Sequence, residues 1–404
     1  MKTFYFDNAA TTYPKPAEVY DFMDFFYRAY GANAGRGQYK ISSATSKLIF
    51  ETRGLVKSLL LCPNKEVVFA PSATVAMNML ILGIERARQK SAEDTKAMTV
   101  YISPFEHNAV TRTLHSLEKD ARAKVNVLPI QKDFSYDLEK IELLFEKEKP
   151  DLLILSHVSN VCGLVCPVEK LCALAKKRGS LTILDMAQSA VLLPLNVGSD
   201  DFDFAVFAGH KTMMGPLGVS GFAANPKALL QKVFPVLFGG TGVESAKQDM
   251  PFDLPSRFEM GSVNIQAIAG LNAALKWWSR DADAIRQKER GNHKRLLEIL
   301  KKYDFLHIAA LPADERIADS SCAAFDPCVG VVSCVFEGYS PDEIGNVLDE
   351  KNVAVRTGLQ CAPLAHKTLG TFPAGTARFS VGAFTSDEDF AGLEDAMEWI
   401  KENI

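Results

Sequence analysis

The chain has 404 residues, 47% of them hydrophobic, so it can bury a large core and should divide into two or more domains. Its 45 basic and 49 acidic residues give a formal net charge of −4, which disfavours nucleic acid as a partner. We find no run of about 18 apolar residues, no signal peptide and no paired spacing of the eight cysteines. This pattern is typical of a cytoplasmic protein without a membrane span or a disulfide framework.

The first part of the chain predicts a short strand at 4–6 and helices over 17–30 and 43–61. Beyond them, short runs rich in Val, Ile and Leu alternate with amphipathic segments of helical length. The expected strands are 66–70, 98–103, 124–130, 151–157 and 181–185. The helices expected between them are 73–89, 108–119, 138–148 and 168–177. This alternation predicts an α/β fold with a largely parallel sheet covered by helices on both faces.

Two further apolar runs, 204–207 and 219–223, follow with no helix between them. A parallel partner needs a longer crossover, so the last strand should be antiparallel and complete a mainly parallel, seven-stranded sheet. The C-terminal part changes character after a long charged helix over 281–302. Its other expected elements are strands at 330–336, 353–355 and 376–381 and helices over 341–351 and 386–402. We predict a large α/β domain, residues 15–279, and a small α+β domain formed by residues 1–14 and 280–404.

The loop between the last two strands of the large domain holds Lys211 beside His210, with Gly209, Gly215 and Gly218 nearby. The glycines reduce side-chain bulk, so the lysine can lie close to the strand end and lose contact with water. Desolvation disfavours the ammonium form and makes the amine a usable nucleophile. Such an amine can form a Schiff base with an aldehyde, above all with pyridoxal phosphate (PLP). The loop alone leaves open an ordinary loop lysine beside a core-edge histidine.

Residues after the other parallel strands support a ligand site, because ligands of open α/β sheets bind outside the carboxyl ends of the strands. Small residues that include Ala73 and Thr74 open a helix whose N-terminus suits a phosphate. Polar side chains follow the next strands: Glu106, His107, Asn160, Asp185 and Gln188. Each has an ordinary interpretation alone, such as a helix cap for Asp185. Together they suit one ligand with an anionic tail, a ring and a ring nitrogen, and PLP has all three.

Several segments then carry a resemblance to a known family. They are DNAATTYPKP, FEHNAV, SNVCG, DMAQS, FAGHKTMMGPLG, RFEMGSVNIQAIAGL, RTGLQCAPLAH and GTARFSVGAFTSDEDF. In collinear order from Tyr5 to about Phe390, the chain resembles the class V aminotransferase family, specifically its cysteine desulfurase branch. The resemblance implies a PLP-dependent homodimer of fold type I. It also implies conversion of L-cysteine to L-alanine, with the sulfur left on the enzyme as a persulfide for an acceptor protein, as in iron–sulfur cluster assembly.

The same resemblance implies a role for each cofactor-binding residue. Lys211 is the Schiff-base lysine, His107 stacks on the ring, and Asp185 pairs with the ring nitrogen. Gln188 and Asn160 reach the ring oxygen. The phosphate is held by Ala73, Thr74 and His210, together with Thr241 of the partner subunit.

For the substrate, the resemblance implies that Cys361 accepts the sulfur and that Arg378 binds the carboxylate. The other candidates for substrate binding are Asn33, Arg36 and Arg356. Alternatives within this assignment are a selenocysteine lyase, which acts on selenocysteine, and another class V activity such as an aminotransferase or an epimerase.

Two departures from the family pattern bear on turnover. The family commonly has a hydroxyl residue where this chain has Ala208, and the lost hydrogen bond to phosphate is worth about 1–3 kcal/mol. We therefore expect weaker retention of PLP. Some relatives have a histidine just before the catalytic cysteine, where this chain has Gln360. Both departures favour a further alternative, a PLP-binding protein with little turnover.

The cysteines divide by their surroundings. Cys361 lies in a segment rich in Gly, Pro and Thr, near Arg356, which predicts a surface loop with a partly ionised thiol. Three others lie in apolar periodic runs and are expected in the core: Cys62, Cys172 and Cys334. Cys162 and Cys166, with His157 upstream, lack a second pair of ligands, so no metal site is predicted.

Overall fold

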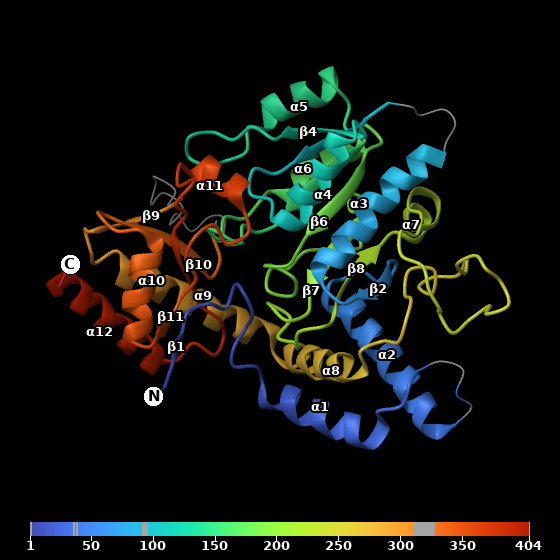
Figure 1. The fold of residues 1–404 in the computed structure, drawn as a ribbon, viewed down its shortest axis with the longest axis horizontal. Helices are drawn as coiled ribbons and strands as arrows, with labels where there is room; N and C mark the ends of the chain where they lie inside the picture. Colours follow the sequence, from blue (N-terminus) through green and yellow to red (C-terminus); the bar gives the residue numbers. More distant parts are fainter. Residues whose placement is uncertain (1, 35–36, 38, 91–95, 311–327, 404) are drawn as a thin grey trace.

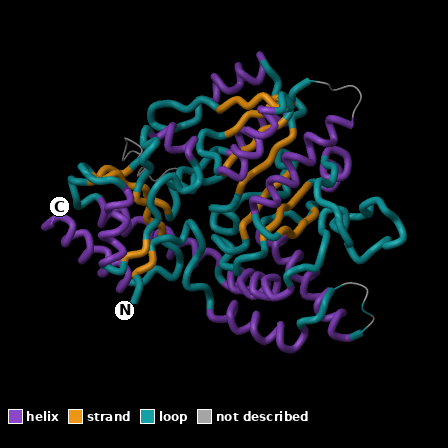
Figure 2. Tube along the Cα trace, viewed as in Figure 1, coloured by secondary structure: helices purple, strands orange, loops and turns teal. Residues whose placement is uncertain are grey.

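The computed structural model describes residues 2–34, 37, 39–90, 96–310 and 328–403. Figures 1 and 2 show a twisted central sheet with helices packed on it, and a smaller group of strands and helices that contains both ends of the chain. Within the described residues, no helix is both long and apolar enough to cross a bilayer.

Seven strands form the central sheet in the order β2-β8-β7-β6-β5-β3-β4. They are β2 (Glu66–Ala70), β3 (Met98–Ile102), β4 (Ala123–Val127), β5 (Leu152–Ser156), β6 (Leu181–Asp185), β7 (Phe204–Ala208) and β8 (Ser220–Ala224). Strands β4, β3, β5, β6 and β7 pair in parallel. Strand β8 is antiparallel to both of its neighbours, β7 and β2. The mainly parallel, seven-stranded sheet with its antiparallel final strand is confirmed.

Helices cover both faces of this sheet because its strands are apolar on both sides. In β2, Val67 and Phe69 face one layer of helices, and Val68 and Ala70 face the other. The first layer contains α1 (Ala17–Tyr30), α2 (Lys40–Leu59), α5 (Leu138–Lys147), α6 (Val168–Lys176) and α8 (Ile265–Arg280). The second contains α3 (Ala73–Lys90), α4 (Asn108–Lys119) and α7 (Pro226–Lys232).

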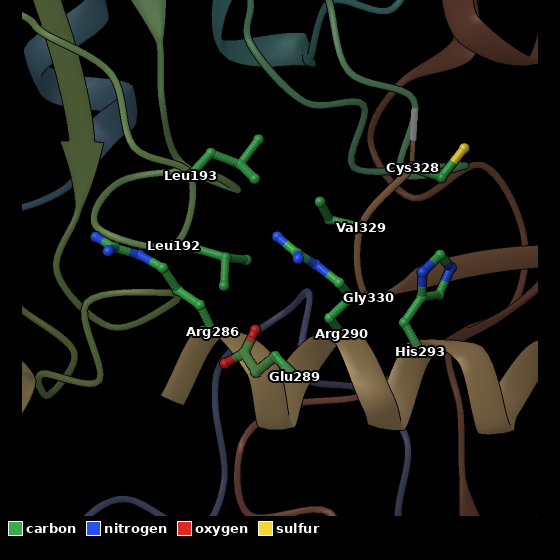
Figure 3. A pocket seen from close by; sticks show the side chains of 9 residues that line it. All are labelled: Leu192, Leu193, Arg286, Glu289, Arg290, His293, Cys328, Val329 and Gly330. Carbon is green, nitrogen blue, oxygen red and sulfur yellow. The ribbon is translucent and has the colours of Figure 1, made fainter. Parts of the chain in front are cut away.

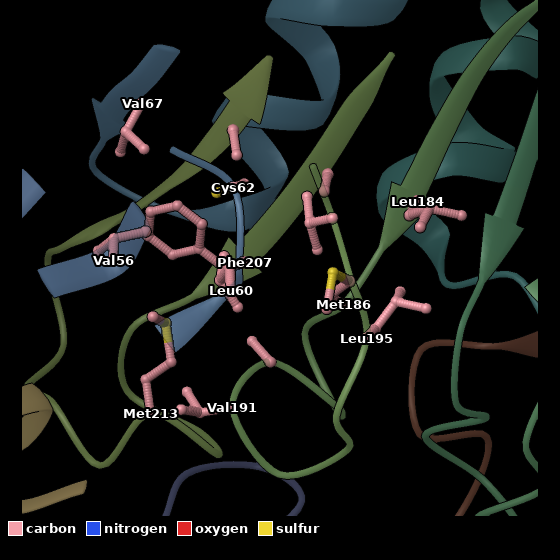
Figure 4. Close-up of a cluster of buried hydrophobic side chains, with 14 of the residues drawn as sticks. Val56, Leu60, Cys62, Val67, Leu184, Met186, Val191, Leu195, Phe207 and Met213 are labelled. Atoms are coloured by element: carbon pink, nitrogen blue, oxygen red, sulfur yellow. The ribbon is translucent and has the colours of Figure 1, made fainter. Parts of the chain in front are cut away.

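Figure 4 shows part of the first layer, where the end of α2 meets the sheet. Val56 and Leu60 lie in one apolar cluster with Phe207 of β7, and Cys62 lies among them. All three cysteines assigned to the core are inaccessible to solvent, which confirms that prediction: Cys62, Cys172 and Cys334.

The smaller group of elements joins the two ends of the chain. Strand β1 (Phe4–Tyr5) pairs in parallel with β11 (Val353–Ala354). Strands β12 (Ala377–Ser380), β10 (Val331–Phe336) and β9 (Leu306–Ile308) form an antiparallel sheet. The helices of this part are α9 (Ala282–Leu300), α10 (Pro341–Glu350), α11 (Pro363–Leu369) and α12 (Asp387–Asn403). Phe6 shares an apolar cluster with Leu296 and Phe379. This packing supports the predicted domain boundaries at residues 14–15 and 279–280, which stay a prediction.

Some elements differ from the sequence prediction. Helix α2 begins at Lys40 rather than near residue 43, and Ser42 is fully buried although its segment is polar. Helices α7, α8 and α11 and strand β9 were not predicted. Helix α8 packs against α1 and α2 as well as the sheet, so most of its residues are buried.

Candidate active site

One pocket lies at the carboxyl ends of five strands of the central sheet. Parallel strands end at the same edge, so the segments after β2, β3, β5, β6 and β7 meet there. The sequence-predicted residues that line this pocket are Ala73, Thr74, His107, Asn160, Asp185, Gln188, His210 and Lys211. Residues distant in sequence are therefore brought together as the strand-end argument predicted.

Lys211 lies in the tight connection between β7 and β8. A Cβ atom at Gly209 would collide with the carbonyl oxygen of Val219, and one at Gly215 would lie 2.9 Å from the carbonyl oxygen of Gly209. Glycine at these positions therefore allows β8 to return close to β7. Burial lowers the pKa of Lys211 to about 8, although the negative charge of Asp185 opposes this shift. The amine thus loses its proton nearer to neutral pH than an ordinary lysine does.

Asp185 and His107 both have a structural hydrogen bond and a place on the pocket wall. Asp185 Oδ1 accepts a hydrogen bond from the amide of Ala187 at 2.9 Å, but the residues after Asp185 form a turn and no helix, so Asp185 is not a helix cap. The residue also lines the pocket. His107 Nδ1 accepts from the amide of Ala109 at 3.0 Å and caps α4. This bond assigns the proton of the neutral ring to Nε2. Burial lowers the pKa of His107, so a neutral ring is available for stacking on an aromatic ligand.

The start of α3 and His210 offer hydrogen-bond donors to an anion. The carbonyl of Ser72 accepts from the amide of Ala76, and its hydroxyl accepts from the amide of Val75. In the described part of the chain, the amides of Ala73 and Thr74 therefore stay available at the N-terminus of a long helix. His210 Nδ1 is buried and has no hydrogen-bond partner among the described residues. These unpaired donors suit a phosphate.

The N-terminal segment supports the site, a role that sequence analysis did not assign. The carbonyl of His210 accepts hydrogen bonds from Thr12 N and Lys15 Nζ, both at 3.2 Å. Gln188 Nε2 donates to the carbonyl of Ala9 at 2.8 Å. The segment DNAATTYPKP gave a sequence signal for this role, because its two threonines and its lysine are hydrogen-bond donors close together in one turn.

Two of the three predicted substrate-binding arginines, Arg378 and Arg356, meet at one carboxylate, that of Asp7. Arg378 is 2% exposed; its Nη2 lies 2.7 Å from Asp7 Oδ1, and its Nη1 donates to the carbonyl of Asn160 at 2.8 Å. Arg356 forms an ion pair with Asp7 at 3.1 Å. Arg378 Nε is buried and unpaired within the described residues. Neither arginine lines the pocket itself, but Asn160 links Arg378 to its wall.

Cys361 is exposed, as the sequence predicted for a loop thiol. Its carbonyl accepts a hydrogen bond from the amide of Asn108 at 2.8 Å, and Asn160 Nδ2 donates to the carbonyl of Gln360 at 2.8 Å. The cysteine loop is thus attached to the pocket wall at two points. An ionised Cys361 also raises the pKa of Lys211, so the thiol lies within electrostatic range of the amine.

Other predicted residues lie elsewhere. Thr241 is in an exposed loop outside the pocket, and Asn33 is exposed and does not line it. Arg36 lies outside the described residues. Glu106, grouped with His107 at the rim, is fully buried beneath it and accepts hydrogen bonds from Ser156 N and Oγ. Burial raises the pKa of Glu106 to about 8.

A second, smaller pocket lies along α9 (Figure 3). Its lining residues are Leu192, Leu193, Arg286, Glu289, Arg290, His293, Cys328, Val329 and Gly330. Burial raises the pKa of Glu289 to about 7. Cys162 and Cys166 are buried, and over residues 2–34, 37, 39–90, 96–310 and 328–403 no cluster of His, Cys, Asp and Glu is arranged to hold a metal ion.

A family model described as "Aminotransferase class-V" matches residues 4–393 of this chain. The chain belongs to the class V aminotransferase family. This confirms the resemblance inferred from the sequence segments.

Two curated relatives of this class V protein are named probable cysteine desulfurases. The one from Halalkalibacterium halodurans is 29% identical over 98% of this chain and 93% of its own length. The one from Streptomyces coelicolor is 30% identical over 99% and 92%. The apo structure of a cysteine desulfurase from Thermococcus onnurineus is similar, with a TM-score of 0.86, 28% identity and coverage of 100% and 95%. A cysteine desulfurase from Escherichia coli has a TM-score of 0.83, 26% identity and coverage of 99% and 95%. The predicted fold type is confirmed.

Proposed function

We propose that this chain is a PLP-dependent cysteine desulfurase that converts L-cysteine to L-alanine and keeps the sulfur as a persulfide on Cys361. One observation carries the proposal. An exposed thiol is attached to the wall of a pocket that contains a lysine of lowered pKa and a carboxylate. A transamination site needs the lysine and the carboxylate but has no use for the thiol. The names of the relatives support the same activity.

The pocket suits PLP. Lys211 would join the aldehyde, Asp185 would pair with the ring nitrogen, and His107 would stack on the ring. The other residues that would hold it are Ala73, Thr74 and His210 at the phosphate and Asn160 and Gln188 at the ring oxygen. When bound, PLP supplies an electron sink that stabilises negative charge at the substrate α-carbon.

The chain's own residues would bind and orient the amino acid. The positive charges of Arg378 and Arg356 would attract the substrate carboxylate, while Asp7 holds both guanidinium groups in place. Lys211 would take and return the α-proton, because an amine with a pKa of about 8 can both accept and donate near neutral pH.

Cys361 would carry out the sulfur transfer. As a thiolate, its Sγ attacks the substrate sulfur, so that a sulfur–sulfur bond forms and the bond from sulfur to the substrate β-carbon breaks. The electron pair of the broken bond stays with the carbon, which takes up a proton and gives alanine. An acceptor protein would then remove the sulfur from the exposed loop.

A coupled assay of alanine and sulfide from L-cysteine, with a thiol reductant present, tests this function. We expect the two products in equal amounts. Keto acid in their place would identify an aminotransferase, and turnover of selenocysteine alone would identify a lyase. A cofactor spectrum without turnover would identify a PLP-binding protein, for which Ala208 on the pocket wall would be the first residue to exchange for serine.

Asp185→Asn keeps the shape of the side chain and removes its charge. We expect kcat to fall by about 100-fold or more, because a neutral amide cannot keep the ring nitrogen protonated. The pKa of Lys211 should also fall further below about 8, since Asp185 now opposes its lowering. Steady-state kinetics measure the first effect, and the pH dependence of PLP attachment to cofactor-free protein measures the second. If neither differs from wild type, Asp185 serves only to hold the turn at Ala187.

The active unit is proposed to be a cytoplasmic homodimer, in which Thr241 of the partner subunit completes the phosphate site. Large apolar side chains exposed on the described surface support this: Phe50 (78%), Phe252 (66%), Leu217 (65%) and Phe238 (61%). Mixing inactive Lys211→Ala chains with Thr241→Val chains tests both points. If Thr241 acts across the interface, one site of each mixed dimer is intact and activity returns. A fully active monomer in sedimentation would contradict the proposal.

A further inference from the structure

Gln360 stands where some relatives have a histidine, but its side chain does not line the Lys211 pocket. It is 6% exposed and lies between helix α11 and the start of strand β12. Its Oε1 is 2.8 Å from Nε2 of His366, and its Nε2 donates to the carbonyl of Thr376 at 3.0 Å. On the other side of the imidazole, Nδ1 is 2.8 Å from the hydroxyl of Thr371.

The chemistry of the partners determines the direction of each hydrogen bond. The carbonyl of Thr376 can only accept, so the amide nitrogen of Gln360 faces it and the amide oxygen faces His366. Nε2 of His366 must therefore donate to Gln360, and Nδ1 accepts from the hydroxyl of Thr371. Burial lowers the pKa of His366 to about 4, so this neutral tautomer persists at working pH.

The network holds a backbone that needs support. Gln360 and Cys361 are consecutive non-glycine residues in the left-handed region, with φ of 40° and 58°. L-residues with a Cβ adopt this region at an energetic cost, so the turn persists only where its surroundings fix it. The hydrogen bonds from Asn160 Nδ2 and Asn108 N fix the two carbonyls, and His366 fixes the side chain.

We infer that the His366–Gln360 pair positions the Cys361 thiol for sulfur transfer by holding this left-handed turn against the pocket wall. Both are positioning residues, because their side chains bond to each other and to Thr371 and Thr376 and act on the thiol only through the turn. The inference rests on the proposed desulfurase function. It gives Gln360 a structural task at the position where some relatives have a histidine.

The role predicts a separation of kcat from KM. Gln360→Met conserves length and removes every hydrogen bond of the Gln360 side chain, and it should slow persulfide formation on Cys361 by about tenfold. KM for L-cysteine and the cofactor spectrum should not change, because Arg378, Lys211 and Asp185 are untouched. The rate is measured in a single turnover by mass spectrometry of the peptide that contains Cys361.

A second pair of variants tests the same bond without altering Gln360. His366→Gln keeps a donor at the position of Nε2, whereas His366→Phe removes it, so the glutamine variant should recover most of the rate that the phenylalanine variant loses. Thr368→Val is the matched control on α11, because the Thr368 hydroxyl donates only to Leu364 of the same helix. It should react at the wild-type rate.

Amide exchange of the segment 356–369 gives a readout that needs no turnover, and it should become faster in Gln360→Met and His366→Phe. The inference is overturned if Gln360→Met forms persulfide at the wild-type rate, or if His366→Gln is as slow as His366→Phe. If wild-type protein forms no persulfide, the proposed function fails. Amide exchange then still tests the His366–Gln360 hydrogen bonds. An unchanged exchange rate in Gln360→Met would show that the pair does not hold the turn.

Discussion

Lys211→Ala should remove measurable formation of alanine from L-cysteine, a loss of at least about 10³-fold. Alanine has no amine to join the cofactor aldehyde and no group to move the α-proton. The connection between β7 and β8 should keep its shape, because its close approach depends on Gly209 and Gly215 and not on the lysine side chain. Visible absorbance of the purified protein and the coupled alanine assay measure the two losses.

The matched control for this variant is Lys227→Ala, which removes an exposed lysine at the start of α7. It should keep full activity. The pH dependence gives an independent check, because the free amine is the reactive form and burial lowers its pKa to about 8. Attachment of PLP to cofactor-free wild-type protein should become faster as pH rises through this value and level off above it. A fully active Lys211→Ala variant would refute the assignment.

Much of the fold could be predicted because its signals are local. Strands buried on both faces read as short apolar runs, and amphipathic helices separate them, so β2 to β8 and helices α3 to α6 follow from the sequence. The pocket residues could be predicted for the same reason, since each follows a strand directly. Helix α8 was not predicted, and its place between α1, α2 and the sheet depends on contacts between segments far apart in the chain.

The parts of the site that could not be predicted depend on pairs far apart in the chain. Nothing near Asp7 in the sequence indicates that it binds Arg378, which comes from β12. The departure at Gln360 was read as the loss of a functional group, because its partner His366 becomes visible only when α11 folds back over the cysteine loop. The sequence therefore predicted the residues that line the pocket, but not the contacts that hold Arg378 and the Cys361 loop beside it.

Cys361→Ser should abolish alanine formation from L-cysteine while leaving the cofactor spectrum intact. Serine has nearly the same size as cysteine, so the left-handed turn and its bonds to Asn108 and Asn160 should persist. A hydroxyl is a poor nucleophile toward sulfur and is not ionised at neutral pH, whereas a thiolate attacks sulfur readily. We expect alanine production to fall by at least about 10³-fold, because no cysteine that the structure describes lines the pocket and could attack the substrate sulfur in place of Cys361.

Cys328→Ser is the control, since this residue lines the separate pocket along α9 and should not affect turnover. Mass spectrometry of wild-type protein after incubation with L-cysteine should find one additional sulfur on the peptide with Cys361. Cys162 and Cys166 are buried, and burial raises the pKa of both thiols, that of Cys162 to about 11, so neither can offer a thiolate at neutral pH. Sulfur on either of them, or alanine that accumulates with no persulfide, would contradict the mechanism. Retained activity of Cys361→Ser on selenocysteine would instead indicate a lyase, because selenium can leave without attack by the thiol.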